Sequence, residues 1–432
     1  MKDIKTQIKE VYKKYYIGLI LLFITTVIAI INIRNNHYSD IYIKLVLSFA
    51  YGSIVAILIR NVLDRLKKNK LNYLLYLLIP ILICTIYFYL LDSINIGSCG
   101  LKYIILLIST SILYFIIPFI NNKKDSINYT YKVIISLLIT ILCFILLFVG
   151  ISLIIFSVSL LFELNILEHV YMEIYMFLLG IVVPPIFLIA ESKIESKEKY
   201  PNFINKIIIY IIYPMLSIYT LILYSYFIKV LIEFKWPANI LGNLIIYYSL
   251  VSIGVLYFTY NKTFNKYIDK LIKIYPYVLI MPIIMMLITF IIRINNYGIT
   301  ELRYYGILCF IFVLISTIIM KTINKLKYII LTLSLLLILS SFGPLSAFNL
   351  SKNSQEKRLE QILIKNNMLK DNKIIPNSDI NGEDRYRILN ILEYFNNMHG
   401  FKDIEVLPKN FNMDKIEEVF GFYPAEIIEP EY

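Results

Sequence analysis

Residues 133–162 read VIISLLITILCFILLFVGISLIIFSVSLLF, an apolar stretch without a charged side chain. A helix needs about 20 apolar residues to cross the hydrocarbon core of a bilayer, so this stretch can span a membrane. Ten further segments are also long and mainly apolar: 17–33, 41–59, 71–91, 101–120, 170–190, 204–232, 240–260, 274–292, 305–320 and 326–348. The sequence therefore predicts an all-α fold, a polytopic transmembrane helical bundle with about 11 spans.

The overall composition agrees with a membrane protein. Of 432 residues, 59% are hydrophobic and 17% are charged, with a mean hydropathy of +0.71. A soluble domain carries roughly 25% charged residues. The net charge of +12 is uneven, because residues 1–348 hold 31 basic against 15 acidic side chains, whereas residues 349–432 hold 11 against 15. This charge is typical of loops beside an anionic leaflet, so the expected partner is the lipid bilayer and not nucleic acid.

The positive side chains also predict a topology. Six alternate segments, beginning with the amino end, hold 24 Lys and Arg residues, whereas the segments between them hold seven. Cytoplasmic loops carry such an excess. We therefore expect a multi-pass protein with a cytoplasmic amino terminus and an extracytoplasmic carboxyl terminus.

The composition becomes soluble after Phe348, which predicts a transmembrane domain over 1–348 and a small helical extracytoplasmic module over 349–432. Asn353 or Ser354 can cap a first helix of this module, and Asn381 can cap a second. Gly400 is a suitable stop for the second helix. The expected apolar faces consist of Leu359, Ile362 and Leu363 in the first helix and Ile388, Ile391, Leu392 and Phe395 in the second.

Few residues indicate catalysis. The chain has no P-loop, H-E-x-x-H, G-x-S-x-G or Rossmann glycine pattern, and its four cysteines are too scattered to bind a metal, so we expect no cofactor. Asp40 is a weak catalytic candidate, because multi-span glycosyltransferases use an acid in their first outer loop. It is equally suited to cap the second helix. No ionisable side chain lies near a predicted mid-membrane position, which argues against an ion-coupled carrier.

The connection at 293–305, R-I-N-N-Y-G-I-T-E-L-R-Y-Y, combines charged and aromatic side chains on the predicted outer surface. One interpretation is an aromatic belt with a turn at Gly298, followed by a helix that Thr300 caps. The other is a polar lip that binds an anionic group, since arginine pairs well with such groups. The candidate ligand-binding residues are Arg293, Tyr297, Glu301 and Arg303.

Glycine and proline mark further structural positions. We expect the pair Pro184 and Pro185 to break the sixth span, because proline lacks the N–H that a helix needs. Gly298 belongs to the turn just described, and Gly343 and Pro344 lie where the last span ends.

The 293–305 stretch, S-S-F-G-P-L-S-A-F at 340–348 and S-K-N-S-Q-E-K-R-L-E at 351–360 together resemble a known family. This is the family of bacterial membrane proteins called domain of unknown function 4153, and the similarity is strongest over about 275–375. The resemblance implies a multi-span protein of the bacterial plasma (inner) membrane. The family has no established activity, so no catalytic residue is carried over.

Three function classes remain open. The first is a non-enzymatic envelope component that binds an envelope protein or a lipid-like ligand. The second is a transporter or flippase of a small or lipid-like solute, which a cavity reaching the midplane would favour. The third is a membrane-embedded glycosyl or lipid transferase, which an acid facing a lipid groove would favour.

Overall fold

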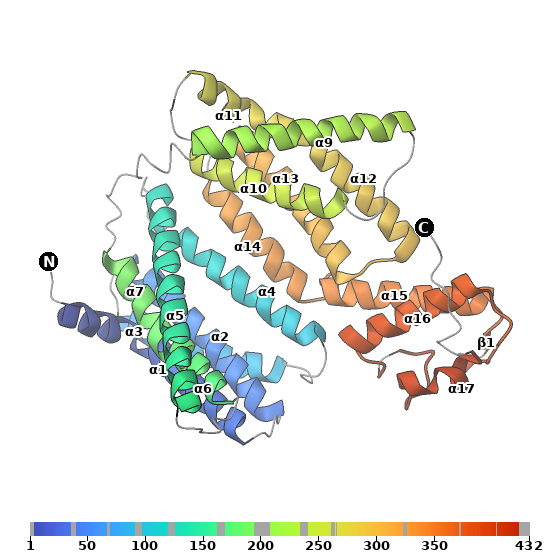
Figure 1. Cartoon of the computed structure of the whole chain (residues 1–432), viewed down its shortest axis with the longest axis horizontal. Coiled ribbons are helices and arrows are strands. Elements are labelled where there is room, and N and C mark those ends of the chain that lie inside the picture. The colour runs from blue at the N-terminus through green and yellow to red at the C-terminus, as the bar shows by residue number, and fades with distance from the viewer. Residues whose placement is uncertain are drawn as a thin grey trace. The chain divides into compact units, whose positions relative to one another are not determined.

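A computed structural model of the chain describes residues 4–35, 40–66, 70–90, 97–119, 126–161, 169–193, 208–233, 241–260, 264, 266–322, 326–370, 373–402 and 404–422. Almost all of them are helical (Figure 1). The protein is therefore all-α, as the sequence predicts.

The chain divides into two compact units, which are described separately. Unit 1 comprises Met1–Ile94 and Leu106–Ile207, and unit 2 comprises Asn95–Ile105 and Ile208–Tyr432. Helix α4, Gly97–Leu113, contributes to both. The other elements of unit 1 are α1 Ile4–Arg34, α2 Asp40–Leu63, α3 Lys70–Leu90, η1 Tyr114–Phe119, α5 Ser126–Leu161, α6 His169–Phe177, η2 Leu178–Val182 and α7 Val183–Lys193.

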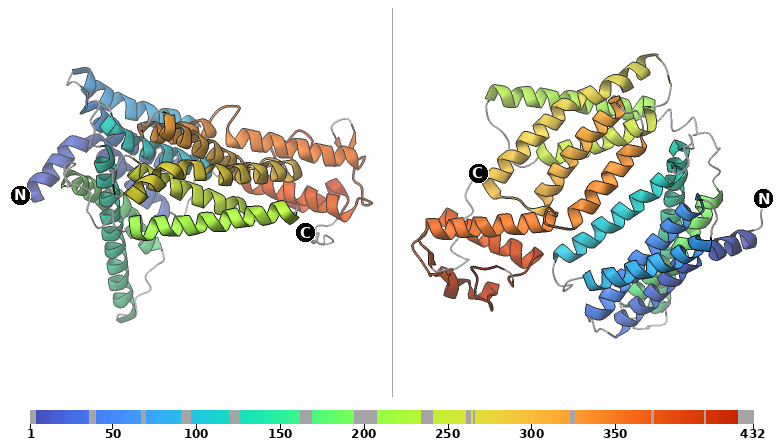
Figure 2. Two further views of the ribbon diagram at one scale, coloured as in Figure 1. Left: turned by 90° about the horizontal axis from the view of Figure 1, so that it is seen from above. Right: turned by 180° about the vertical axis from the view of Figure 1, so that it is seen from behind.

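Unit 2 holds the helices from α9 to α14 and the tail (Figures 1 and 2). Its elements are η3 Ile208–Ile212, α9 Tyr213–Glu233, α10 Leu241–Thr259, α11 Lys266–Val278, α12 Ile280–Tyr297, α13 Glu301–Thr322, α14 Lys327–Ser341, α15 Ala347–Lys365, β1 Leu369–Lys370, β2 Lys373–Ile374, α16 Gly382–Met398, η4 Met413–Lys415 and α17 Ile416–Phe420. The two strands form an antiparallel hairpin.

Within the described residues, eight helical stretches are long and apolar enough to cross a membrane. They are Thr6–Arg34, Asp40–Leu63, Gly97–Ile117, Tyr129–Ile155, His169–Ser192, Ile208–Glu233, Lys266–Tyr297 and Glu301–Thr322. Three apolar helices are shorter: Tyr73–Tyr89, Leu244–Thr259 and Lys327–Ser341. The polytopic helical architecture is thus present, while about 11 spans stays a prediction.

The helix at Pro184 and Pro185 continues where we expected a break. Both prolines lie in the first turn of α7, directly after the π-helical turn η2. Val183 N–H donates to the Leu178 carbonyl across this wider turn. Proline supplies no N–H and crowds the preceding turn, and a single π turn absorbs such a disturbance without ending the helix.

The turn between α14 and α15 contains Gly343 and Pro344. Gly343 has φ +83°, a conformation that favours glycine, and its carbonyl accepts hydrogen bonds from the Ser346 N–H and the Asn349 side chain. Ser346 then caps α15, because its hydroxyl accepts from the Asn349 N–H at 3.3 Å. The prediction that Asn353 or Ser354 caps this helix was wrong, since both lie inside α15.

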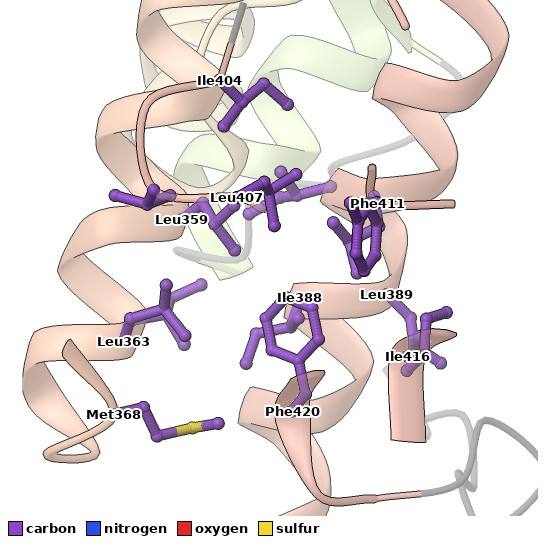
Figure 3. Packing of buried hydrophobic residues seen from close by; sticks show 14 of the residues in the cluster. Leu359, Leu363, Met368, Ile388, Leu389, Ile404, Leu407, Phe411, Ile416 and Phe420 are labelled. Atoms are coloured by element: carbon purple, nitrogen blue, oxygen red, sulfur yellow. The ribbon is translucent and has the colours of Figure 1, made fainter. Parts of the chain in front are cut away.

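The tail has a hydrophobic core of its own, formed by α15, α16, α17 and the loop between the last two (Figure 3). Leu359, Leu363, Ile388 and Phe420 are each fully buried in it. The N-cap of α16 is confirmed: Asn381 Oδ1 accepts from Asp384 N–H at 2.7 Å. Gly400 follows the helix with φ +71°, as a helix stop should. That residues 349–432 form a module outside the membrane stays a prediction.

Candidate functional site

The connection that the sequence singled out joins α12 to α13 in unit 2. Gly298 ends α12 with φ +69° and ψ −178°, and its N–H donates to the Ile294 carbonyl. This conformation is open to almost no residue other than glycine. A Cβ at this position would lie 2.9 Å from Gln355 Nε2 and 3.2 Å from Ser354 Oγ. The turn is therefore shaped to receive helix α15.

Polar side chains of α15 and α13 converge on the backbone of this turn. Gln355 Nε2 donates to the carbonyls of Tyr297 and Ile299 at 3.0 and 2.9 Å. Arg358 and Arg303 each donate through Nη1 to the Tyr297 carbonyl at 2.8 and 2.9 Å, and Arg303 also donates to the Gly298 carbonyl at 2.7 Å. Their guanidinium groups lie over the Tyr297 ring. The carbonyl of Tyr297 is thus a point of attachment for α15, and Arg303 holds the α12–α13 connection in place.

Glu301 has a different set of partners. It is 3% exposed at the first turn of α13. Tyr394 Oη donates to its two carboxylate oxygens at 2.9 and 3.0 Å, and His399 Nε2 lies 2.8 Å from Oε1. Burial first, and then the nearby carboxylate, raises the pKa of Tyr394 above its ordinary value, which keeps the phenol protonated as a donor. Glu301 therefore links α13 to α16.

A cavity of about 740 Å³ lies beside this connection. Its walls are mostly apolar and come from α10, α12, α13 and α14, with two residues of α16 at one end. The lining residues are Ile246, Tyr247, Leu250, Phe290, Arg293, Tyr297, Thr300, Leu302, Arg303, Tyr305, Gly306, Leu308, Cys309, Phe312, Leu333, Leu337, Tyr386 and Asn390. Two candidate residues, Arg293 and Arg303, bring positive charge to it, and no lining residue is acidic. Volumes of roughly 300–1,000 Å³ are usual for ligand pockets.

The cavity extends deep along α13. Its lining runs from Leu302 to Phe312 on that helix. A rise of about 1.5 Å per residue makes this about 15 Å, half of the roughly 30 Å hydrocarbon core. The cavity therefore combines a charged end at the α12–α13 connection with an apolar interior that extends about halfway along α13.

A smaller cavity of about 200 Å³ adjoins the charged end. Three arginines line it: Arg303 from α13, Arg358 from α15 and Arg387 from α16. Both cavities share Tyr297, Thr300, Arg303, Tyr386 and Asn390.

Asp384 lies on the neighbouring face of α16. Burial by itself would raise the pKa of its carboxyl, but hydrogen bonds from Lys365 and Asn366 reverse this shift, and the net pKa lies below its ordinary value. Asp384 is thus a carboxylate at neutral pH and is already paired with Lys365, at 2.8 Å.

The structure does not join the weak catalytic candidate to other reactive groups. Asp40 is the first residue of α2 and is exposed, consistent with a place in the first turn of that helix. Its neighbour in sequence, His37, lies outside the described residues. Across the residues that the structure covers, no group of three or more His, Cys, Asp or Glu side chains is placed to hold a metal.

Sequence reasoning missed a buried polar cluster in unit 1. Asn61 of α2 accepts from Tyr15 Oη at 2.6 Å and donates to Tyr114 Oη at 2.9 Å, and Tyr114 in turn donates to Glu191. Glu191 also lies 3.7 Å from Lys132 Nζ. Glu191 opens a run of mixed charge, ESKIESKEKY at 191–200, which is typical of a solvated loop, but Glu191 itself is buried near the end of α7. These contacts connect five helical elements: α1, α2, η1, α5 and α7.

Apolar helices of this length, packed with only a small hydrophilic tail, define the class: a polytopic helical membrane protein. Residues 17–373 match the domain of unknown function DUF4153, and the chain belongs to that family, which confirms the resemblance. It is also similar to an uncharacterized protein of Pasteurella multocida, with 23% identity over 294 residues. That match covers 63% of this chain and 49% of the relative, so the chain matches about half of the relative's length. No solved structure matches.

Proposed function

We propose that this protein is a non-enzymatic component of the bacterial cell envelope that binds a lipid-like anionic amphiphile in the 740 Å³ cavity of unit 2. The observation that carries the proposal is the combination of an apolar interior with arginines at one end. An amphiphile needs both surroundings at once. Glu301, Tyr394 and His399 are the polar groups that most resemble a catalytic cluster. They hydrogen bond to one another and do not line the 740 Å³ cavity.

The proposal includes a location and a topology. The protein lies in the bacterial plasma membrane with its amino terminus in the cytoplasm and its tail outside, which the 24-to-7 distribution of Lys and Arg supports. In a cysteine-free background, a membrane-impermeant thiol reagent added to intact cells should label Lys402→Cys in the tail and not Lys270→Cys in α11. Labelling of Lys270→Cys alone would show that the protein has the opposite orientation.

Filling the cavity tests the binding proposal. Cys309 of α13 and Leu337 of α14 line it from two different helices. Cys309→Phe and Leu337→Phe should each reduce the lipid that remains bound to the purified full-length protein by about tenfold, because a ring occupies space that an acyl chain needs. Native mass spectrometry in mild detergent measures this directly.

A matched control lies on the same helix. Ile318 of α13 is 50% exposed and lines none of the cavity, so Ile318→Phe adds similar bulk to a lipid-facing position and should leave bound lipid unchanged. All variants are compared at parental helicity and elution volume. Parental lipid retention in both cavity variants, with the fold intact, would contradict the proposal.

A second candidate function is movement of the amphiphile across the membrane. The observation that favours it is the depth of the cavity, which reaches Phe312 about halfway along the span. Proteoliposomes with a fluorescent anionic lipid in the inner leaflet separate the two functions. If the protein is a carrier, an external quencher reduces the fluorescence faster in these proteoliposomes than in protein-free vesicles. If the protein only binds lipid, the two rates are equal.

A further inference from the structure

The 200 Å³ cavity that three arginines line adjoins the 740 Å³ cavity and has the features of a headgroup site. Its ten lining residues are Tyr297, Thr300, Arg303, Gln355, Arg358, Tyr386, Arg387, Asn390, Ile391 and Tyr394. Three of them are cations and none is an anion. Guanidinium groups that face one cavity repel one another unless an anion lies between them.

The nearby carboxylates already have partners. Glu301 is held by Tyr394 and His399, and Asp384 is held by Lys365 and Asn366. Glu383 pairs with Arg387 one turn away on the surface of α16, where both side chains are partly exposed. None of these three acids lines the cavity.

Arg303, which lines the cavity, also has N–H donors that are not used within the described residues. Among the described residues, Arg303 hydrogen bonds only through Nη1, to the carbonyls of Tyr297 and Gly298. A guanidinium carries five N–H donors in a planar fork, so Nε and Nη2 stay free for an oxyanion. Thr300 and Asn390 add neutral polar groups to the same lining.

We propose that this cavity binds a phosphomonoester dianion, carried as the headgroup of the amphiphile whose chains occupy the adjoining cavity. This inference rests on the proposed function and names its ligand class. A dianion matches the excess of positive charge better than a phosphodiester monoanion does. A zwitterionic ethanolamine headgroup would bring an ammonium into a cavity that offers it three cations and no carboxylate.

The test compares three lipids with identical acyl chains on the full-length protein in detergent. Phosphatidic acid should bind about tenfold more tightly than phosphatidylglycerol, and more tightly still than phosphatidylethanolamine. Equal binding of the three lipids would overturn the headgroup assignment while leaving the amphiphile cavity standing. If none of the three lipids binds to the parental protein, or if Cys309→Phe does not reduce their binding, the proposed function itself is wrong.

Arg387 is the best position for a variant, because it takes no part in holding the Tyr297 turn. Arg387→Gln should reduce the preference for phosphatidic acid by about tenfold without changing the melting temperature. Glu383→Gln, which removes the surface partner of Arg387, should preserve or increase the preference. Lys402→Gln, an exposed tail cation outside the cavity, is the charge-matched control. An unchanged preference in Arg387→Gln would overturn the assignment.

Inorganic phosphate distinguishes a lipid headgroup from a free ion. If the lipid provides the dianion, millimolar phosphate should compete weakly and should not reproduce the stabilisation by phosphatidic acid. Full stabilisation by inorganic phosphate alone, abolished in Arg387→Gln, would show that the cavity takes a free anion and would overturn the lipid part of the inference.

Discussion

The double variant Tyr394→Phe, His399→Phe is expected to destabilise the attachment of the tail by about 3–5 kcal/mol. The side chain of Glu301 is 4% exposed, and its hydrogen bonds come from Tyr394 of α16 and from His399, the residue directly after that helix. Removing them leaves a carboxylate in a buried position without compensation. Hydrogen exchange of the α16 amides in the full-length protein should accelerate at least about 100-fold.

A triple variant separates lost pairing from lost packing. Adding Glu301→Leu removes the carboxylate that the double variant leaves unpaired, so most of the protection of α16 should return. If the triple variant exchanges as fast as the double variant, the effect comes from packing around Phe395 and not from the buried charge. Parental exchange in the double variant would show that the three groups do not fix the tail.

Gly298→Ala is expected to have the next largest effect. Alanine at φ +69° and ψ −178° costs about 1–3 kcal/mol in backbone strain. Its Cβ would also displace Gln355, which holds two carbonyls of the turn, each bond contributing about 0.5–1.5 kcal/mol. We therefore expect a loss of about 2–5 kcal/mol, measured as a lower melting temperature and faster exchange in α15.

Two other glycines calibrate this result. Gly343 has φ +83° but open space around its Cβ position, so Gly343→Ala should cost only the backbone strain. Gly382 has open space and no positive φ, so Gly382→Ala should be nearly neutral. The order of destabilisation should be Gly298, Gly343, Gly382. An equal effect at Gly298 and Gly343 would mean that the contact with α15 contributes nothing.

Local patterns in the sequence were sufficient for several elements. The N-cap Asn381, the helical spacing through Phe395 and the stop at Gly400 depend on neighbouring residues, and all three hold in the structure. The apolar segments likewise correspond to apolar helices, because burial in lipid is decided by composition over a window of residues.

Contacts between distant residues could not be predicted in this way. The 293–305 stretch has turn residues and arginines, but the partners that give it a role, Gln355 and Arg358, follow about 60 positions later. Glu301 has the same limitation, since Tyr394 and His399 lie 93 and 98 positions away. Stretch 351–360, which holds Gln355 and Arg358, was noticeable only through the family resemblance.

The start of α15 was predicted wrongly, and the burial of Glu191 could not be predicted, for a related reason. Ser346 is a good cap, but it lies inside the last predicted span, 326–348, where the start of a new helix is not expected. Glu191 opens a run of mixed charge, which is typical of solvated loops. Its burial depends on Tyr114 and Lys132 from other helices.

The central claim is that a lipid binds in the 740 Å³ cavity of unit 2. An experimental structure of the full-length protein in nanodiscs containing phosphatidic acid tests this claim most directly. We expect elongated density between α10, α12, α13 and α14, reaching Phe312, with its headgroup within hydrogen-bond distance of Arg303 and Arg387. A cavity closed by its own side chains, or lipid density confined to the outer surface of the helices, would contradict the claim.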